Sequence, residues 1–220
     1  MAQIFIEKNY NLYLKRIVDI IGAVILLIFF SPLALLILFL IKIDSKGPIL
    51  ADVPERIGAK GKKFKMYKFR SMMINAHYLL RTDPRLKKLY REYKKSSYKL
   101  KKDPRVTNIG KFIRRHSIDE IPQLLNVLKG EMSLVGPRAY YPDELENQLS
   151  KYPHTKRLVS NVLSVKPGIT GLWQVTGRSE INFDKRIMID ANYVKNMSFW
   201  NDIKIIFLTP VVMISGKGAV

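Results

Sequence analysis

The chain has no cysteine, and its 220 residues include only three histidines. Without cysteine there can be no disulfide bond and no thiolate metal site. The histidines, His77, His116 and His154, are scattered along the sequence, which argues against a zinc site. The sequence also lacks internal repeats and low-complexity tracts, and its length suits one globular domain with a sizeable core.

Acidic residues are scarce as well, since 18 Asp and Glu stand against 38 Lys and Arg, which gives a net charge of +20. Residues 56–115 hold 21 of the basic residues and three acidic ones, so this segment alone carries +18. A basic field of this kind predicts an anionic partner: nucleic acid, an anionic membrane surface or a phosphorylated substrate.

Within the basic segment, apolar residues recur with the spacing of one helix face: Leu86, Leu89, Tyr90 and Tyr93. Lysines and arginines fill the positions between them, which predicts a basic amphipathic helix. Such a helix either lies on an anionic membrane surface or packs on its own domain through the apolar stripe. The sequence leaves both arrangements open.

Charged residues are absent from residues 20–41, a continuous apolar run. As a helix this run would be about 33 Å long, against about 30 Å for the hydrocarbon core of a bilayer. It is too long for a cleavable signal peptide, and Lys15 and Arg16 lie too far from the start. The run is therefore predicted to enter a membrane.

Ser31 and Pro32 lie at the middle of this run, and Pro32 removes the backbone donor that would bond the carbonyl of Ile28. The run is therefore either a kinked spanning helix or a hairpin that enters and leaves by one membrane face. Positive residues flank it on both sides, which gives the hairpin modest support. These residues are Lys8, Lys15 and Arg16 before the run, and Lys42 and Lys46 after it.

Two adjacent carboxylates, Asp119 and Glu120, follow two arginines at a predicted helix start. Ser117 and Glu120 match a capping box, which by itself would explain Glu120. Alternatively Asp119 is the cap, and Pro122 then falls among the free donors of the first turn. In both cases the carboxylates lie in the first turn, where the helix dipole and the arginines are expected to hold them ionised. The helix is predicted to end at Gly130.

This group of residues suits chemistry on phosphate. An ionised aspartate can attack phosphorus and form an acyl phosphate. An adjacent glutamate can hold Mg²⁺, and arginines can clamp the transferring phosphoryl group. The combination fits phosphoryl transfer better than hydrolysis of a peptide or a glycoside.

Three further segments are predicted to carry basic side chains on strands or turns. Residues 63–70, KFKMYKFR, suit a short strand with a basic face. Residues 133–138, SLVGPR, read as a short strand and a turn that ends in Arg138. Residues 166–178 place three glycines among turn residues before Arg178, and glycine lets the backbone approach a ligand closely.

The order of these motifs resembles the bacterial sugar transferase family, the monotopic phosphoglycosyl transferases. The resemblance rests on the apolar run broken at Ser-Pro, then KMYKFRSM, KDPRVTNIGKFIRRHSIDEIPQLLNVLKGEMSLVGPR, VKPGITGLWQVTGR and IDANYVKNMSFWNDIKIIF, across residues 15–208. It implies a ping-pong transfer of sugar-1-phosphate from a UDP-sugar, preferably a UDP-hexose, to polyprenyl (undecaprenyl) phosphate. UMP would be released, and the product would start a surface glycan such as O-antigen or capsule.

The resemblance also implies roles for particular residues. Asp119 would be the nucleophile and Glu120 the Mg²⁺ ligand, while Arg114 and Arg138 would contact phosphate. The apolar run would be a re-entrant helix-break-helix with its break at Ser31-Pro32, on the cytoplasmic face of the bacterial inner membrane. Further candidates for substrate binding are Lys68, Arg70, Arg178 and Asp190, of which Asp190 could equally pair with a structural cation.

The predicted fold is α+β, mostly helical with a small sheet. Residues 1–46 form the membrane segment and residues 47–220 a catalytic domain fused to it. Residues 203–214 are apolar but too short to span and contain Pro210, so they either dock on the membrane surface or pack in the core. Oligomeric state is left open.

Two other functions compete with the enzyme. A membrane-anchored module could bind anionic lipids through the basic field without any chemistry. Nucleic-acid binding would also explain the charge, but the apolar run and the absence of a recognised binding motif argue against it.

Overall fold

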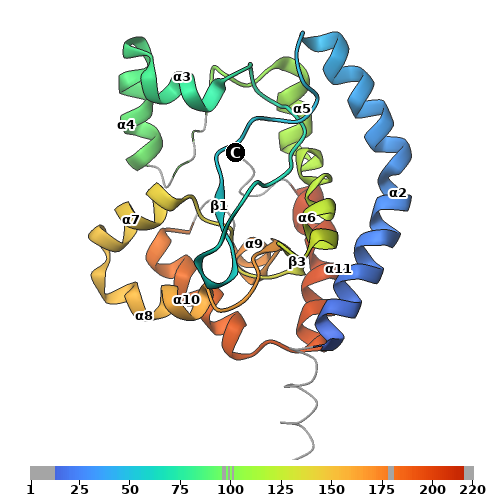
Figure 1. Cartoon of the computed structure of the whole chain (residues 1–220), viewed down its shortest axis with the longest axis vertical. Coiled ribbons are helices and arrows are strands. Elements are labelled where there is room, and N and C mark those ends of the chain that lie inside the picture. The colour runs from blue at the N-terminus through green and yellow to red at the C-terminus, as the bar shows by residue number, and fades with distance from the viewer. Residues whose placement is uncertain (1–12, 96–97, 99, 101, 178–180, 216–220) are drawn as a thin grey trace, which may run out of the picture.

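The computed structural model describes residues 13–95, 98, 100, 102–177 and 181–215. Helices dominate, with two small two-stranded sheets, which confirms the predicted fold class (Figure 1). The α-helices are α2 (Lys15–Asp44), α3 (Ala76–Thr82), α4 (Lys87–Lys95), α5 (Asn108–Arg115), α6 (Gln123–Lys129), α7 (Pro142–Lys151), α8 (Lys156–Val162), α9 (Leu172–Thr176), α10 (Phe183–Lys195) and α11 (Phe199–Ser215). Short 3₁₀ turns are η2 (Ala59–Gly61), η3 (Pro84–Leu86), η4 (Ile118–Glu120) and η5 (Pro153–Thr155).

Both sheets are minimal. Strand β1 (Arg56–Ile57) pairs antiparallel with β2 (Lys63–Phe64), so the strand predicted over residues 63–70 is regular only at its beginning. Strand β3 (Ser133–Val135) pairs parallel with β4 (Gly168–Thr170). A Cβ on Gly168 would lie 2.0 Å from the Gly136 nitrogen. These two glycines therefore allow two backbone segments to approach one another closely.

The main core lies where α2, α6 and α11 meet the β3–β4 pair. Its buried members include Ala23 of α2, Val127 of α6, Leu134 of β3 and Ile205 of α11. Figure 1 shows α2 along one side of the molecule, with α6 and α11 beside it and with α3 and α4 on the opposite side. The segments that line the main cavity of the protein lie between these two sides.

Helix α2 continues through Ser31 and Pro32, and Figure 1 shows that it bends. The Ser31 hydroxyl donates to the Ile28 carbonyl at 2.8 Å. This is the carbonyl that Pro32 leaves without a backbone donor, so a side chain replaces the missing bond. The structure thus places one bent helix where the sequence predicted a helix, a break and a second helix.

The middle of α2 is an exposed apolar surface. Ile28, Phe29 and Leu35 are each about two thirds or more exposed, at 69%, 73% and 66%. Among the described helices, α2 alone is long and apolar enough to cross a membrane. An apolar surface of this size is expected to contact lipid or another apolar partner.

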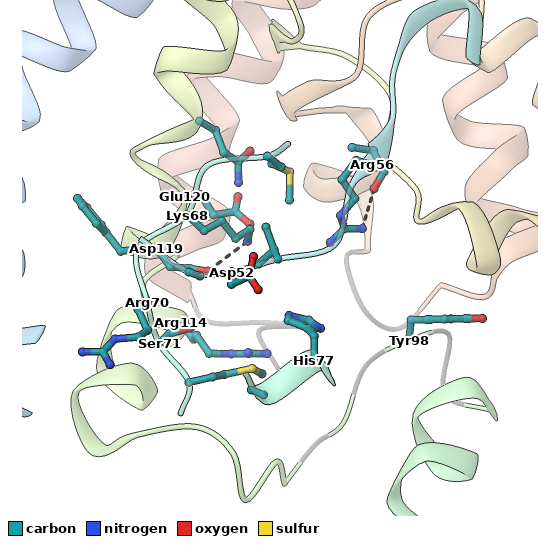
Figure 2. Close-up of a pocket in the computed structure, with 18 of the residues that line it drawn as sticks. Asp52, Arg56, Lys68, Arg70, Ser71, His77, Tyr98, Arg114, Asp119 and Glu120 are labelled. Atoms are coloured by element: carbon teal, nitrogen blue, oxygen red, sulfur yellow. Dashed lines mark hydrogen bonds and ion pairs between the residues drawn. The ribbon is translucent and has the colours of Figure 1, made fainter. Parts of the chain in front are cut away.

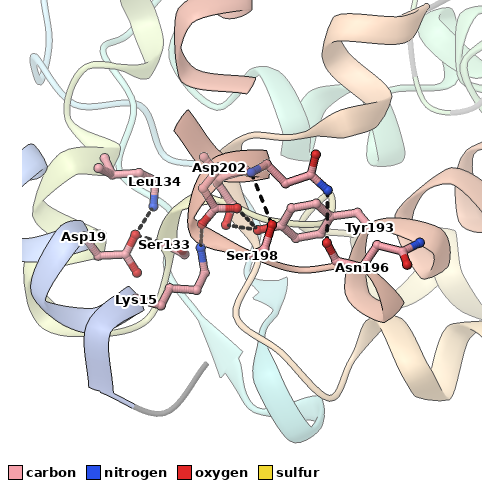
Figure 3. Close-up of polar contacts among 10 residues, drawn as sticks. Lys15, Asp19, Ser133, Leu134, Tyr193, Asn196, Ser198 and Asp202 are labelled. Atoms are coloured by element: carbon pink, nitrogen blue, oxygen red, sulfur yellow. Dashed lines mark hydrogen bonds and ion pairs between the residues drawn. The ribbon is translucent and has the colours of Figure 1, made fainter. Parts of the chain in front are cut away.

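The ends of α2 are held by the domain. Near its start, Lys15 pairs with Asp202 at 2.5 Å, and Asp202 also accepts from the Tyr193 hydroxyl at 2.6 Å. One turn later, Asp19 accepts hydrogen bonds from the Ser133 hydroxyl and the Leu134 amide (Figure 3). Near its other end, Ile37 and Ile41 are buried in a cluster with Phe69 and Ile113.

The basic helix is α4, and its apolar stripe packs on the domain. Leu86, Leu89 and Tyr90 pack against a cluster that contains Tyr93 itself, and the other members of this cluster are Leu80, Tyr98, Leu100 and Tyr141. This is the second of the two predicted arrangements. The lysines of α4 remain exposed, on the side of the molecule opposite α2 (Figure 1).

Helix α11 divides its apolar residues between the core and the surface. Ile205 is buried in the main core, whereas Trp200, Phe207 and Val211 are exposed. The predicted core packing is therefore confirmed for the face that carries Ile205, while docking of the exposed face on a membrane stays a prediction.

We predict that Lys15→Met lowers the free energy of unfolding by about 3–5 kcal/mol, because it leaves the Asp202 carboxylate buried without its cation. Lys15→Arg, which keeps the charge, is the matched control and should lose far less. Denaturant unfolding in detergent measures both. A loss below about 1 kcal/mol for Lys15→Met would show that the pair contributes no more than an exposed one.

Candidate active site

A cavity of about 300 Å³ opens between α3, α5, η4 and the segment before β1. The residues that line it come from widely separated parts of the chain. Figure 2 shows the carboxylate pair at one end of it, Arg56 and Tyr98 at the other, and His77 between them. Charged and aromatic lining residues are Asp52, Arg56, Lys68, Arg70, His77, Tyr93, Tyr98, Asp103, Arg105, Arg114, Asp119, Glu120, Arg138, Tyr141 and Trp173.

The carboxylates Asp119 and Glu120 lie in the 3₁₀ turn η4, ahead of the helix. Ser117 precedes this turn in a left-handed conformation (φ 54°) and makes no side-chain capping bond, while α6 begins only at Gln123. Both predicted helix starts are therefore wrong. The predicted end is confirmed, since Gly130 closes α6 with a φ of 80°.

Lys68 joins the two carboxylates. Its Nζ lies 3.1 Å from Asp119 Oδ2 and 2.8 Å from Glu120 Oε1 (Figure 2). The backbone of the same segment also contributes, because the Phe69 amide donates to the Asp119 carbonyl at 3.0 Å. Sequence reasoning proposed Lys68 as a phosphate contact, and the structure places its ammonium beside the dyad where a phosphate could also reach it.

Burial raises the pKa of Asp119 above its ordinary value, and the neighbouring Glu120 carboxylate adds to the effect, while Lys68 and Arg114 oppose it. The sequence predicted that arginines and the helix dipole would hold this group ionised; burial outweighs them. Burial would lower the pKa of Lys68, but Asp119 and Glu120 outweigh it and raise that pKa. Lys68 therefore keeps its proton and supplies the positive charge of the pair.

Arg114 and Arg138 both reach the cavity, as predicted. Arg114 comes from the last turn of α5, and Figure 2 shows it extending from beneath Asp119 towards His77. Arg138 follows β3, and its guanidinium carbon lies 5.2 Å from the centroid of the Trp173 ring. The cavity thus holds the dyad and both predicted phosphate contacts.

Arg70 is a correction. Its guanidinium points away from the cavity (Figure 2) and donates to three carbonyls at the C-terminal end of α2, those of Ile41, Ser45 and Lys46, at 3.4, 2.7 and 2.6 Å. A side chain committed to these carbonyls is a structural contact to α2. The prediction that Arg70 binds substrate phosphate is therefore not supported.

Asp190 is a second correction. It is fully buried outside the cavity lining and accepts hydrogen bonds from the Arg138 amide at 3.2 Å and the Tyr140 hydroxyl at 3.3 Å. It therefore supports the backbone at Arg138, which favours the structural role that the sequence left open for it. Arg178, the remaining candidate, lies outside the described residues.

Sequence reasoning missed the wall of the cavity opposite the dyad. Arg56 lies over the ring of Tyr141, 3.3 Å from its centroid, and donates to the Ala139 carbonyl. Burial, together with Arg105, Arg56 and other arginines, lowers the pKa of His77 to about 4. A neutral histidine among arginines marks a site of strong positive potential, and the only sequence signal for it was the excess charge of residues 56–115.

The donor set fits Mg²⁺ bound jointly with a substrate. No group of three or more His, Cys, Asp or Glu side chains within the described ranges could hold a metal by itself. Mg²⁺ usually takes one or two carboxylates and completes its shell with water and substrate phosphates. Asp119 and Glu120 provide such a partial set at the cavity.

Together, the structure combines a long, exposed apolar helix with a cavity in which arginines surround two carboxylates. The chain belongs to the bacterial sugar transferase family, whose model matches residues 10–216.

Three relatives illustrate the range of the family. The undecaprenyl-phosphate galactose phosphotransferase of Salmonella typhimurium is 43% identical over 97% of this chain and 43% of its own length. The exopolysaccharide production protein ExoY of Rhizobium meliloti is 41% identical over 91% of this chain and 86% of its own length. The UDP-N-acetylgalactosamine-undecaprenyl-phosphate N-acetylgalactosaminephosphotransferase of Aeromonas hydrophila is 38% identical over 94% and 45%. The chain thus spans less than half the length of two of these three relatives.

The buried position of Asp190 generates a pH prediction. Burial raises its pKa to about 7, so the folded protein retains a proton that the unfolded chain has released above about pH 4. Stability should therefore fall as the pH rises towards 7. Between pH 5 and pH 8 we expect the wild type to lose about 2–3 kcal/mol relative to Asp190→Asn. Thermal unfolding of both proteins at the two pH values tests this, and parallel curves would contradict it.

Proposed function

We propose that this chain is a phosphoglycosyl transferase that moves a sugar-1-phosphate from a UDP-sugar to a membrane polyprenyl phosphate and so starts a surface glycan. The observation that carries the proposal is the placement of Asp119 and Glu120 on Lys68 within an arginine-lined cavity. Family membership and the printed activities of the relatives support it. The two rival functions do not require a carboxylate pair that shares one lysine within a cavity.

In the first half-reaction, an Asp119 carboxylate oxygen bonds to the β-phosphorus of the donor. The bond from that phosphorus to the bridging oxygen breaks, and UMP leaves with the electron pair. Arg114 and Arg138 are placed to bind the diphosphate, since both line the cavity that holds the dyad. The raised pKa of Asp119 makes its ionised form a better nucleophile than an exposed carboxylate.

In the second half-reaction, a phosphate oxygen of the polyprenyl phosphate attacks the phosphorus held on Asp119. The aspartyl–phosphorus bond breaks, the carboxylate is restored, and polyprenyl diphosphate-sugar leaves. Lys68 is suited to both steps, because its ammonium can pair with the carboxylates when they are charged and with phosphate when Asp119 is esterified.

Glu120 would hold Mg²⁺ at this site, with water and substrate phosphates completing its shell. The ion would offset the negative charge of the diphosphate and of the leaving UMP. The chain's own contribution is to present the two carboxylates side by side on one short turn.

The packing of α2 supports a re-entrant helix on one membrane face. Both of its ends contact the same folded domain, through Lys15 and Asp19 at one end and Ile41 at the other. A spanning helix would place its ends on opposite sides of about 30 Å of hydrocarbon. One domain outside the bilayer could not then contact both ends. Positive flanks favour the cytoplasmic face, where a UDP-sugar is available.

The donor is proposed to be a UDP-hexose. The Salmonella relative is named for galactose, and a relative from Komagataeibacter xylinus that is 40% identical is named for glucose. The Aeromonas relative is named for an amino sugar, so the donor class is tested directly in the experiment below.

We predict that Asp119→Asn reduces UMP release from the best donor in a panel of UDP-sugars by at least about 10³-fold, because it removes the nucleophile. The assay uses the purified protein in nanodiscs with polyprenyl phosphate. Asp143→Asn, which changes a carboxylate of α7, is the control and should remain active. Full turnover by folded, membrane-bound Asp119→Asn would overturn the mechanism, and no UMP from the wild type with any donor would overturn the function.

We predict that Glu120→Gln raises the Mg²⁺ concentration needed for half-maximal UMP release by about tenfold or more, because the carboxylate proposed to bind the ion is lost. Chelation with EDTA should stop the wild-type reaction, and added Mg²⁺ should restore it. An unchanged Mg²⁺ requirement in Glu120→Gln would show that this residue does not hold the ion.

A further inference from the structure

Arg16 of α2 contacts the end of the helix that follows the dyad. Its Nη1 donates to the Val127 carbonyl at 2.6 Å, and its Nη2 donates to the Leu128 carbonyl at 2.8 Å. Carbonyls in the last turn of a helix lack intrahelical donors and carry the negative end of the helix dipole. The guanidinium of Arg16, which donates to two such carbonyls, therefore clamps the C-terminal end of α6. The N-terminal end of α6 lies three residues after Glu120.

Arg70 makes the same kind of contact in the opposite direction. It is buried, and it donates to the carbonyls of Ile41, Ser45 and Lys46, which form the C-terminal end of α2 and the turn after it. Arg70 lies two residues after Lys68, the cation on the dyad. The C-terminal end of α2 is therefore fixed to the segment that carries that cation.

The two clamps connect α2 to the helix that follows the two carboxylates and to the segment that carries Lys68. At its N-terminal end, α2 contributes Arg16, which donates to the C-terminal end of α6. At its C-terminal end, α2 accepts hydrogen bonds from Arg70, which lies on the same segment as Lys68. Between the clamps, the apolar middle of α2 is exposed for contact with lipid. The helix that enters the membrane is thereby joined directly to the segments that carry Asp119, Glu120 and Lys68.

We propose that Arg16 and Arg70 are positioning residues, which use α2 to hold the reaction centre at the bilayer depth that the lipid acceptor requires. This inference rests on the proposed function. The two half-reactions should then respond differently. The UDP-sugar arrives from solution and does not sense depth, whereas the phosphate of a polyprenol embedded in a bilayer lies at a fixed height.

The activity test uses Arg16→Gln and Arg70→Gln, with Arg70→Lys as the conservative variant and Arg85→Gln as the control. Arg85 pairs with Asp83 on the exposed side of the lobe formed by α3 and α4. Three rates are measured: UMP release without acceptor, transfer to a long-chain polyprenyl phosphate in nanodiscs, and transfer to a short-chain polyprenyl phosphate in detergent.

For both Gln variants we expect transfer in nanodiscs to fall about 10- to 100-fold while the other two rates stay within about threefold, since a displacement near 1 Å is enough for such a loss. Arg70→Lys should recover part of the nanodisc rate, and Arg85→Gln should match the wild type. Equal losses in all three assays, or no loss in nanodiscs, would overturn the proposal.

A depth measurement tests the clamps without any chemistry. Because the chain has no cysteine, one cysteine placed at the exposed Lys111 of α5 can carry a single fluorophore. Quenching by lipids brominated at a known depth should change in Arg16→Gln and Arg70→Gln and stay constant in Arg85→Gln. Unchanged quenching in all variants would overturn the positioning role, whatever the activity of the wild type. A wild type that releases no UMP would overturn the proposed function alone.

Discussion

Two adjacent carboxylates repel one another unless a proton or a cation offsets their charge, and Lys68 lies within ion-pair distance of both the buried Asp119 and the half-buried Glu120. The lysine fixes the course of its own segment, which must pass close to η4. Asn126 of α6 reinforces this, since its side chain accepts from the Tyr67 amide and donates to the Lys65 carbonyl. The cavity forms around this contact, because the segment that carries Lys68 and the turn that carries Asp119 and Glu120 are joined by the same ammonium.

The membrane helix is part of this arrangement. Helix α2 exposes its apolar middle, where the Ser31 hydroxyl compensates for the donor that Pro32 lacks. Its polar contacts lie at the ends: Lys15 and Asp19 reach α11 and β3, and Arg70 reaches its final carbonyls. This division satisfies the polar groups inside the protein and leaves the lipid-facing surface apolar, as a bilayer demands.

Behind the cavity, buried polar groups hold the loop that carries Arg138. Asp190 accepts its backbone amide, and the fully buried Glu144 lies 3.9 Å from its Nε. The ring centroid of Trp173 lies 5.2 Å from the guanidinium carbon of Arg138 and 5.4 Å from that of Arg186. An arginine supported in this way is preorganised for a phosphate, because little rotamer freedom remains to be lost on binding.

Several features could be predicted from the sequence because they depend on neighbours along the chain. The mostly helical fold, the end of α6 at Gly130 and the basic helix at residues 87–95 are of this kind. The dyad, Arg114 and Arg138 were singled out from motifs whose order is characteristic of the family, and the structure brings all four residues to one cavity. What the sequence did not specify was the environment of each group. It gave the wrong start for α6, because the left-handed Ser117 depends on how η4 packs.

The sequence by itself determined which residues carry charge, which run is apolar and where the two adjacent carboxylates lie. Only the tertiary structure decided which cation serves which purpose. Lys68 and Arg70 are two residues apart in one motif, yet one binds the dyad and the other caps α2. Asp190 likewise acquired its role from Arg138, 52 residues away, and the pKa of His77 is lowered chiefly by burial and by Arg105, 28 residues away. The physical reason is that burial and long-range contacts set the partner and the pKa of a charged group, and neither is encoded in its neighbours along the chain.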